Sequence, residues 1–157
     1  MTSGRSTEEE LTVEDIADKS FISLDENTLV AEAAKTLYER EGSSIVVTRN
    51  DPKTGLRVPV GIVTERDIIF RVVAQNKGPF KITLSRIMSS PVTVIDAGSP
   101  MMDALEIMKE KGFKRLPVVT KDGEMIGLVT MAMLMRKVPL RSKRPADNNS
   151  NRDSNAA

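Results

Sequence analysis

The stretch GIVTERDII (residues 61–69) has a counterpart in GLVTMAMLM (residues 127–135), and this pair decides how the whole chain is interpreted. Both stretches read glycine, an apolar residue, valine and threonine, and both then continue into a sequence that favours a helix. They differ three residues after the threonine, where Asp67 corresponds to Met133. The recurrence indicates two related halves, and the difference raises the question whether Asp67 caps a helix or holds a ligand.

The repeat extends over most of the chain at a constant offset. Residues 11–47 align without a gap on residues 82–118, so that Ile16 corresponds to Ile87 and Asp25 to Asp96, 71 residues apart. After these segments the offset falls to 66, because Gly61 corresponds to Gly127. The first half therefore carries about five extra residues within TRNDPKTGLRVP (48–59), which we expect to form a surface loop because it is rich in turn-forming residues.

Each half is predicted to contain a short opening segment, a strand, a helix, a β-hairpin and a second helix. Apolar residues recur at spacings of three and four in 29–37 and in 101–108, as in amphipathic helices, with Thr28 and Ser99 as the expected N-caps and Pro100 at a first helical position. The short apolar runs SIVV and RLPVV, each followed by turn residues and a second apolar run, are typical of hairpins. One half buries too little surface to be stable alone. The fold class is therefore α/β (α+β), with two pseudo-symmetric βαββα repeats packed sheet to sheet.

The domain boundaries follow from these patterns. We expect a flexible N-terminus at 1–10, a first repeat at 11–75, a linker at 76–81, a second repeat at 82–138, and a disordered, basic and Asn/Ser-rich tail at 139–157.

Composition excludes several classes of function. The chain of 157 residues has no cysteine and no histidine, which removes disulfides, thiolate metal sites, the commonest metal ligand and the commonest general base. The start is polar and acidic, no apolar run is long enough to cross a membrane, and the net charge is only +1. We expect a cytoplasmic protein that is not an enzyme, with no catalytic residues, no metal, no cofactor and no membrane contact.

Two matched repeats, each with glycine, an apolar residue, valine and threonine before the second helix, resemble the cystathionine-beta-synthase-type (CBS) domain, which occurs in pairs called Bateman modules. The likeness covers roughly residues 11–138, and RLPVV strengthens it. The resemblance implies two clefts that bind adenine nucleotides or adenosyl compounds, such as AMP, ADP, ATP or S-adenosylmethionine, as effectors. It also implies a homodimer that senses the ligand and modulates an unknown partner protein.

The resemblance also implies which residues form the two clefts. The first cleft would be made by Gly61, Ile62, Thr64, Arg66, Asp67, Pro91, Val92, Thr93, Lys114, Arg115, Leu116 and Pro117. In it, Asp67 would accept hydrogen bonds from ribose hydroxyls and the cations would meet phosphates. The second would be made by Ile22, Ser23, Ser43, Ser44, Thr130 and Met133. We expect the second cleft to be weak or empty, because Met133 cannot accept a hydrogen bond and GSSI (42–45) has no cation.

Two alternatives are kept beside this interpretation. Residues 64–67 also have the form of a capping box, with threonine at the N-cap and an acid three residues later, and this role can coexist with ligand binding. The alternative function is a nucleic-acid-associated regulator that uses the basic C-terminal flank, with Arg136, Lys137, Arg141, Lys143 and Arg144.

Overall fold

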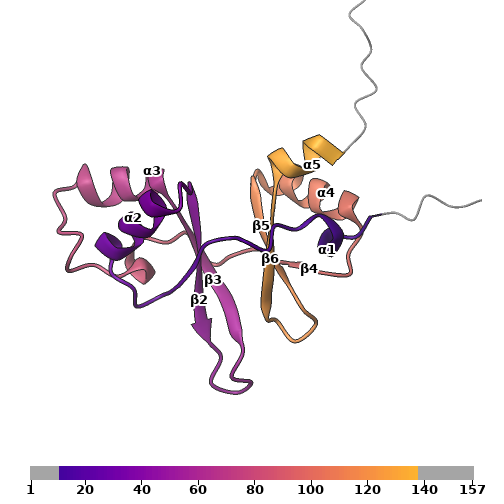
Figure 1. The fold of residues 1–157 in the computed structure, drawn as a ribbon, viewed down its shortest axis with the longest axis horizontal. Helices are drawn as coiled ribbons and strands as arrows, with labels where there is room; N and C mark the ends of the chain where they lie inside the picture. The colour runs from indigo at the N-terminus through magenta and orange to yellow at the C-terminus, as the bar shows by residue number, and fades with distance from the viewer. Residues whose placement is uncertain (1–10, 138–157) are drawn as a thin grey trace, which may run out of the picture.

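The computed structural model describes residues 11–137 and places them in two halves, each built around a three-stranded sheet (Figure 1). The first half contains β1 (Ser23–Asp25), α2 (Val30–Glu39), β2 (Ser44–Asn50), β3 (Arg57–Thr64), α3 (Glu65–Ile68) and the π-helical turn η1 (Ile69–Val73). The second contains β4 (Ile95–Asp96), α4 (Met101–Lys111), β5 (Arg115–Val119), β6 (Met125–Thr130) and α5 (Met131–Lys137). A short helix, α1 (Val13–Ile16), and a 3₁₀ turn, η2 (Leu84–Arg86), precede them. The predicted order of elements is confirmed, and the predicted terminal segments 1–10 and 139–157 lie outside the described residues.

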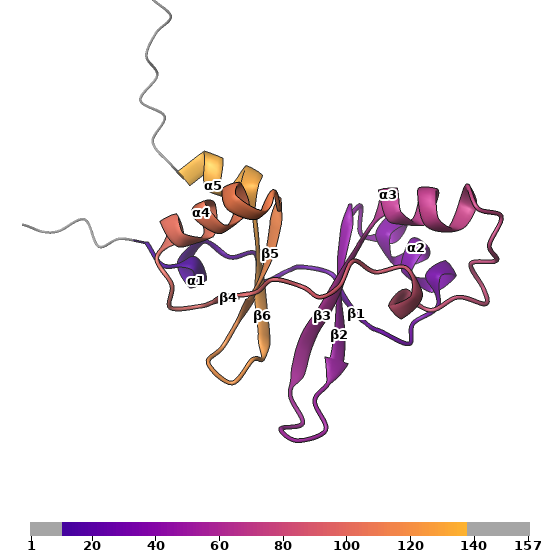
Figure 2. The same ribbon diagram turned by 180° about the vertical axis from the view of Figure 1, so that it is seen from behind.

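The two sheets have the same topology. In each, the first strand pairs parallel with the second, which forms an antiparallel hairpin with the third. The register places Val47 opposite Gly61 and Val118 opposite Gly127, and an irregularity follows each of these valines. Strands β3 and β6 face each other at the centre of the molecule while the helices lie on the outside (Figures 1 and 2). The predicted fold class is thereby confirmed.

The opening segments of the two halves are exchanged. Val13 and Ile16 are buried in the core of the second half, and Leu84 and Ile87 are buried in the core of the first. Figure 1 shows α1 beside α4, although the chain then crosses to the other sheet. The exchange is an economical way to join the halves, because each apolar core is completed by residues that the sequence repeat assigns to the other half.

Two glycines make the crossing possible. A Cβ atom on Gly61 would lie 2.9 Å from the Cβ of Met88, and one on Gly127 would lie 2.9 Å from the Cβ of Ala17. Next to these contacts the opening segments (11–22 and 82–94), called the crossing segments below, pair with the central strands, through Ser89 with Ile62 and Asp18 with Leu128. The glycine of each repeated stretch therefore serves the close approach of two backbone segments.

The expected N-caps are wrong by one residue. Helix α2 has Leu29 at its N-cap and α4 has Pro100, and neither makes a side-chain capping bond. The first helical N–H groups are bonded instead by distant carbonyls, Val30 N–H to Ile82 O at 2.8 Å and Met101 N–H to Leu11 O at 2.9 Å. The exchanged segments thus replace the side-chain caps that local sequence predicts.

Half of the predicted loop at 48–59 is strand. β2 continues to Asn50 and β3 begins at Arg57, so that only 51–56 connect them. The extra residues extend the hairpin beyond the sheet core, as Figure 2 shows, and Arg57 donates to the hydroxyl of the buried Thr48 at 2.8 Å. The turn-forming residues therefore indicate where the hairpin turns, but they do not indicate how far its two strands extend.

Among residues 11–137, none of the helices is both long and apolar enough to cross a membrane.

Because the opening segments are exchanged, a cavity-forming substitution in one of them should destabilise the core of the other half. Leu84→Ala should lower the free energy of unfolding by about 2–5 kcal/mol, because it leaves a cavity in the first core. Amide hydrogen exchange should then accelerate first in β2. The mirror variant Val13→Ala should accelerate exchange first in β5, since Val13 lies in the second core. Faster exchange first in β5 for Leu84→Ala would contradict the exchange of segments.

Candidate functional site

Helix α3 begins at Thr64 with a complete capping box. The Thr64 N–H and hydroxyl donate to Asp67 Oδ2 at 2.8 and 3.1 Å, and the Asp67 N–H donates to the Thr64 hydroxyl at 3.3 Å. The Asp67 side chain is only 17% exposed, and its other oxygen, Oδ1, lies 3.7 Å from Arg71 Nε. Asp67 is therefore the N3 acid of a capping box whose N-cap is Thr64, and its second oxygen takes no part in the box.

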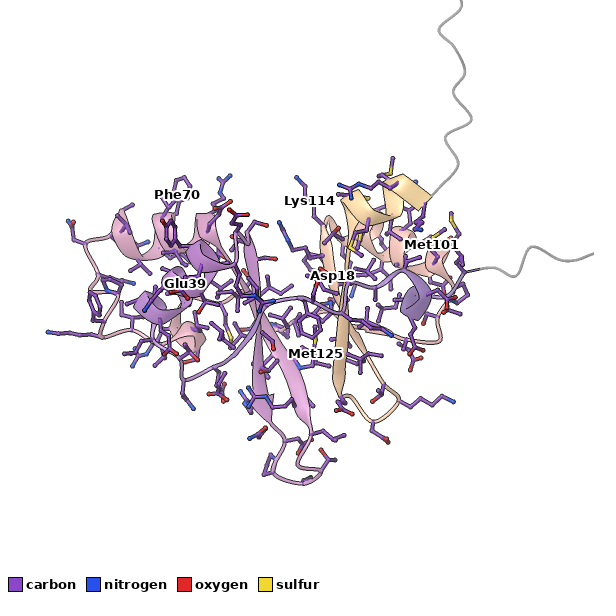
Figure 3. The ribbon with its side chains drawn as sticks, viewed as in Figure 1. Asp18, Glu39, Phe70, Met101, Lys114 and Met125 are labelled. Atoms are coloured by element: carbon purple, nitrogen blue, oxygen red, sulfur yellow. The ribbon has the colours of Figure 1, made fainter. Side chains whose placement is uncertain are left out.

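The same aspartate lines a cavity of about 240 Å³ between the halves. The cavity is lined by Ile62, Thr64, Asp67, Ser89, Pro91, Val92, Thr93, Phe113, Lys114 and Arg115. One wall comes from the end of β3 and the start of α3, and the other from the crossing segment after Ser89 and the start of β5. Figure 3 shows Lys114 at the upper edge of the region between the halves.

The cavity combines three kinds of chemistry. It has one carboxylate, Asp67, and two cations, Lys114 and Arg115, which come from the other half. Hydroxyls of Thr64, Ser89 and Thr93 add hydrogen-bonding groups, and the remaining lining is apolar with one aromatic ring, that of Phe113. A molecule with hydroxyls at one end, an anionic group at the other and a flat apolar part matches this set.

Eight of the residues expected at the first cleft line this cavity: Ile62, Thr64, Asp67, Pro91, Val92, Thr93, Lys114 and Arg115. The other four lie elsewhere. Gly61 faces Met88, Leu116 and Pro117 are buried in β5, and the Arg66 guanidinium lies over the Phe70 ring at 4.8 Å.

Sequence reasoning missed Ser89 and Phe113. Phe113 corresponds to Gly42 at the constant offset and stands beside Lys114, which is a signal that could have been used. Ser89 has no local signal, because only the crossing of its segment over β3 brings it to the cavity.

A second cavity of about 420 Å³ lies at the pseudo-equivalent place. Its lining is Asp18, Ser20, Phe21, Ile22, Arg40, Glu41, Gly42, Ser43, Ser44, Arg115, Leu128, Thr130 and Ala132. Of the residues expected there, Ile22, Ser43, Ser44 and Thr130 are present. Ser23 and Met133 are not among them, and the Met133 N–H donates to the Thr130 hydroxyl at 3.2 Å.

The second cavity has cations that its own GSSI segment lacks. Arg40, the C-cap of α2, donates to Ser20 O at 3.0 Å, and Arg115 reaches this cavity from β5. Arg115 lines both cavities, and none of the ion pairs among residues 11–137 includes it. Although GSSI has no cation, Arg40 and Arg115 therefore give this cavity positive charge. Position 133 is methionine, as expected, and supplies no carboxylate equivalent to that of Asp67.

The basic C-terminal flank is only partly described. Arg136 and Lys137 are exposed in the last turn of α5, where cations complement the helix dipole. Arg141, Lys143 and Arg144 lie outside the described residues.

Comparison with known proteins agrees with this architecture. The family model described as the CBS domain matches the chain twice, at residues 13–74 and 84–140. An uncharacterized protein of Methanopyrus kandleri is 32% identical over 130 residues, which cover 82% of this chain and 63% of that protein. This chain thus spans less than two thirds of that relative's length.

Two solved structures of similar fold hold adenosyl ligands. A CBS domain protein from Pyrobaculum aerophilum complexed with AMP is 29% identical, with a TM-score of 0.65 over 78% of this chain and 89% of that one. A CBS domain pair in complex with 5′-methylthioadenosine and S-adenosyl-L-methionine is 28% identical, with a TM-score of 0.66 over 80% of this chain and 94% of that one. With two family matches that coincide with its two sheets, this chain belongs to the CBS domain family, as a tandem pair.

Proposed function

We propose that this chain is a regulatory module that binds an adenine ribonucleotide in the first cavity and passes its occupancy to a partner protein. The observation that carries the proposal is the placement of Asp67 from one half across from Lys114 and Arg115 of the other. The ligands named in the two similar structures, AMP, 5′-methylthioadenosine and S-adenosyl-L-methionine, all carry an adenosyl group and support the choice of ligand class.

The lining assigns a role to each part of such a ligand. Asp67 Oδ1 accepts from ribose hydroxyls, because Oδ2 is already occupied by Thr64. The adenine lies among Ile62, Pro91, Val92 and the ring of Phe113. A phosphate meets Lys114 and Arg115, and this charge balance favours AMP, ADP or ATP over S-adenosylmethionine, whose sulfonium is a cation.

Regulation follows from the two-sided construction of the cavity. A ligand that touches both walls stabilises the arrangement of the halves that fits it, by no more than its difference in affinity between arrangements. A partner protein that contacts both halves would then respond to the nucleotide.

Removal of the Asp67 carboxylate tests the ligand site. Asp67→Ala should weaken AMP binding by about 1.5–3 kcal/mol, or roughly 10- to 150-fold, as for hydrogen bonds to a charged group. Asp67→Asn should also weaken it, since one amide oxygen can still cap α3 while the NH₂ group cannot accept from ribose. Isothermal titration calorimetry measures both.

Met133→Ala is the matched control at the pseudo-equivalent position and should leave AMP affinity unchanged. Equal losses for Met133→Ala and Asp67→Ala would argue against a single good cleft. If the unmodified protein released no heat with AMP, ADP, ATP or S-adenosylmethionine and its melting stayed unchanged, Asp67 would be a helix cap only.

The cations predict a dependence on phosphate. Lys114→Gln should weaken AMP binding about 3- to 10-fold, because an exposed cation contributes modestly, and should leave adenosine binding unchanged. The comparison of AMP with adenosine in the same calorimeter isolates the phosphate contact. An equal loss for both ligands would mean that Lys114 shapes the cavity and does not meet a phosphate.

We further propose that two copies associate through the outer face of the first half. Tyr38 and Ile69 line one shallow apolar groove between α2 and α3, and Val73 lies one turn beyond Ile69. Tyr38 is 86% exposed, Ile69 55% and Val73 63%, and apolar side chains exposed along neighbouring helices suit a protein–protein contact. A second copy that presents the same face would bury them symmetrically.

Val73→Asp should therefore convert a dimer into a monomer, because it places a charge within the apolar contact. Sedimentation velocity measures the change in mass. Phe80→Asp is the control, since Phe80 is 77% exposed in the linker and does not line the groove. A monomeric unmodified protein, or a variant that still dimerises, would contradict this interface.

A further inference from the structure

The capping box fixes only one of the two carboxylate oxygens of Asp67. The capping box holds Oδ2 at two short distances, 2.8 and 3.1 Å, and involves Oδ1 in neither. A carboxylate held at one oxygen can still tilt, and the direction of Oδ1 decides whether a hydroxyl in the cavity meets a lone pair. Arg71 is the cation beside Oδ1, at 3.7 Å.

Arg71 is itself fixed at its other end. Its Nη1 donates to the carbonyl oxygen of Ile87 at 2.7 Å. Ile87 is buried in the first core and lies two residues before Ser89, which lines the cavity and pairs with Ile62. One guanidinium thus connects the acid of the first wall with the crossing segment that becomes the second wall. A planar guanidinium is suited to this, because the hydrogen bond to Ile87 O fixes its orientation and thereby places its positive charge beside Oδ1.

We propose that Arg71 is a positioning residue for ligand binding: it orients Asp67 Oδ1 toward the cavity and ties that orientation to the segment at Ile87. This inference rests on the proposed function. Arg71 does not line the cavity, so it acts through Asp67 and the crossing segment. At 3.7 Å the Arg71 Nε is too far for a hydrogen bond to Oδ1, which leaves the lone pairs of Oδ1 available to ribose.

A positioning role and a purely structural role of Arg71 predict different effects on ligand preference. If Arg71 orients the acid that meets the ribose, its loss must reduce discrimination between ligands with and without ribose hydroxyls. If Arg71 only stabilised the turn after α3, its loss would weaken every ligand equally. The decisive quantity is therefore the ratio of affinities for AMP and for 2′,3′-dideoxyadenosine monophosphate.

Calorimetry on the full chain tests the proposal. Arg71→Gln should weaken AMP binding about 3- to 10-fold and leave the dideoxy ligand nearly unchanged, as expected for a coupled pair. In the Asp67→Ala background, Arg71→Gln should have no further effect on AMP, because the residue that it orients is gone. Arg86→Gln is the control: Arg86 lies on the same crossing segment and does not line the cavity, so both affinities should be kept.

Each outcome is informative. Equal weakening of both ligands, an unchanged ratio, or tighter AMP binding in Arg71→Gln would overturn the positioning role, the last because Arg71 would then compete with ribose. Absence of AMP binding to the unmodified protein would overturn the proposed function and this inference with it.

If Arg71→Gln does not fold, the unmodified protein provides the test. The Arg71 Nε–Hε resonance should shift more on addition of AMP than on addition of the dideoxy ligand. Equal shifts would overturn the role.

Discussion

The contact on which the rest of the structure depends is the crossing of each opening segment over a central strand at a glycine. Met88 lies against Gly61 and Ala17 against Gly127, where a Cβ atom on either glycine would come within 2.9 Å of the neighbouring Cβ. The crossing carries the apolar residues of each opening segment into the opposite core and supplies backbone acceptors to the first N–H groups of α2 and α4. A larger residue at these glycines would separate the segment from the strand and weaken both cores together.

The same crossing builds the cavities and makes them unlike. Each cavity needs a crossing segment from one half and the end of a central strand from the other, so neither half can form one alone. The pseudo-symmetry then places different side chains at equivalent positions. Asp67 corresponds to Met133 and Phe113 to Gly42, so the carboxylates and the aromatic ring of the second cavity come from other positions, Asp18, Glu41 and Phe21. Arg115 belongs to both linings and is the one charged group that the two cavities share.

In the proposed mechanism the ligand binds between the two halves and changes how they are arranged. Each sheet and its helices form a packed core, and a rigid core transmits a displacement better than a loop does. Asp67 lies in the first turn of α3, and Lys114 and Arg115 lie at the start of β5. A bound nucleotide would therefore contact the ends of a helix and a strand and not a loop.

The repeat, the order of elements and the capping box could be predicted from the sequence, because a constant offset, apolar periodicity and cap residues are visible in it. Most of the first cavity's lining was predicted only through the resemblance to the CBS domain. The sequence also singled out the difference between Asp67 and Met133 on which the asymmetry depends. Tertiary structure alone decided which core the opening segments join, how the helices are capped, that Ser89 and Arg40 reach the two cavities, and that Arg71 meets the carbonyl of Ile87. The physical reason is that these contacts join residues far apart in the chain, and periodicity describes only neighbours.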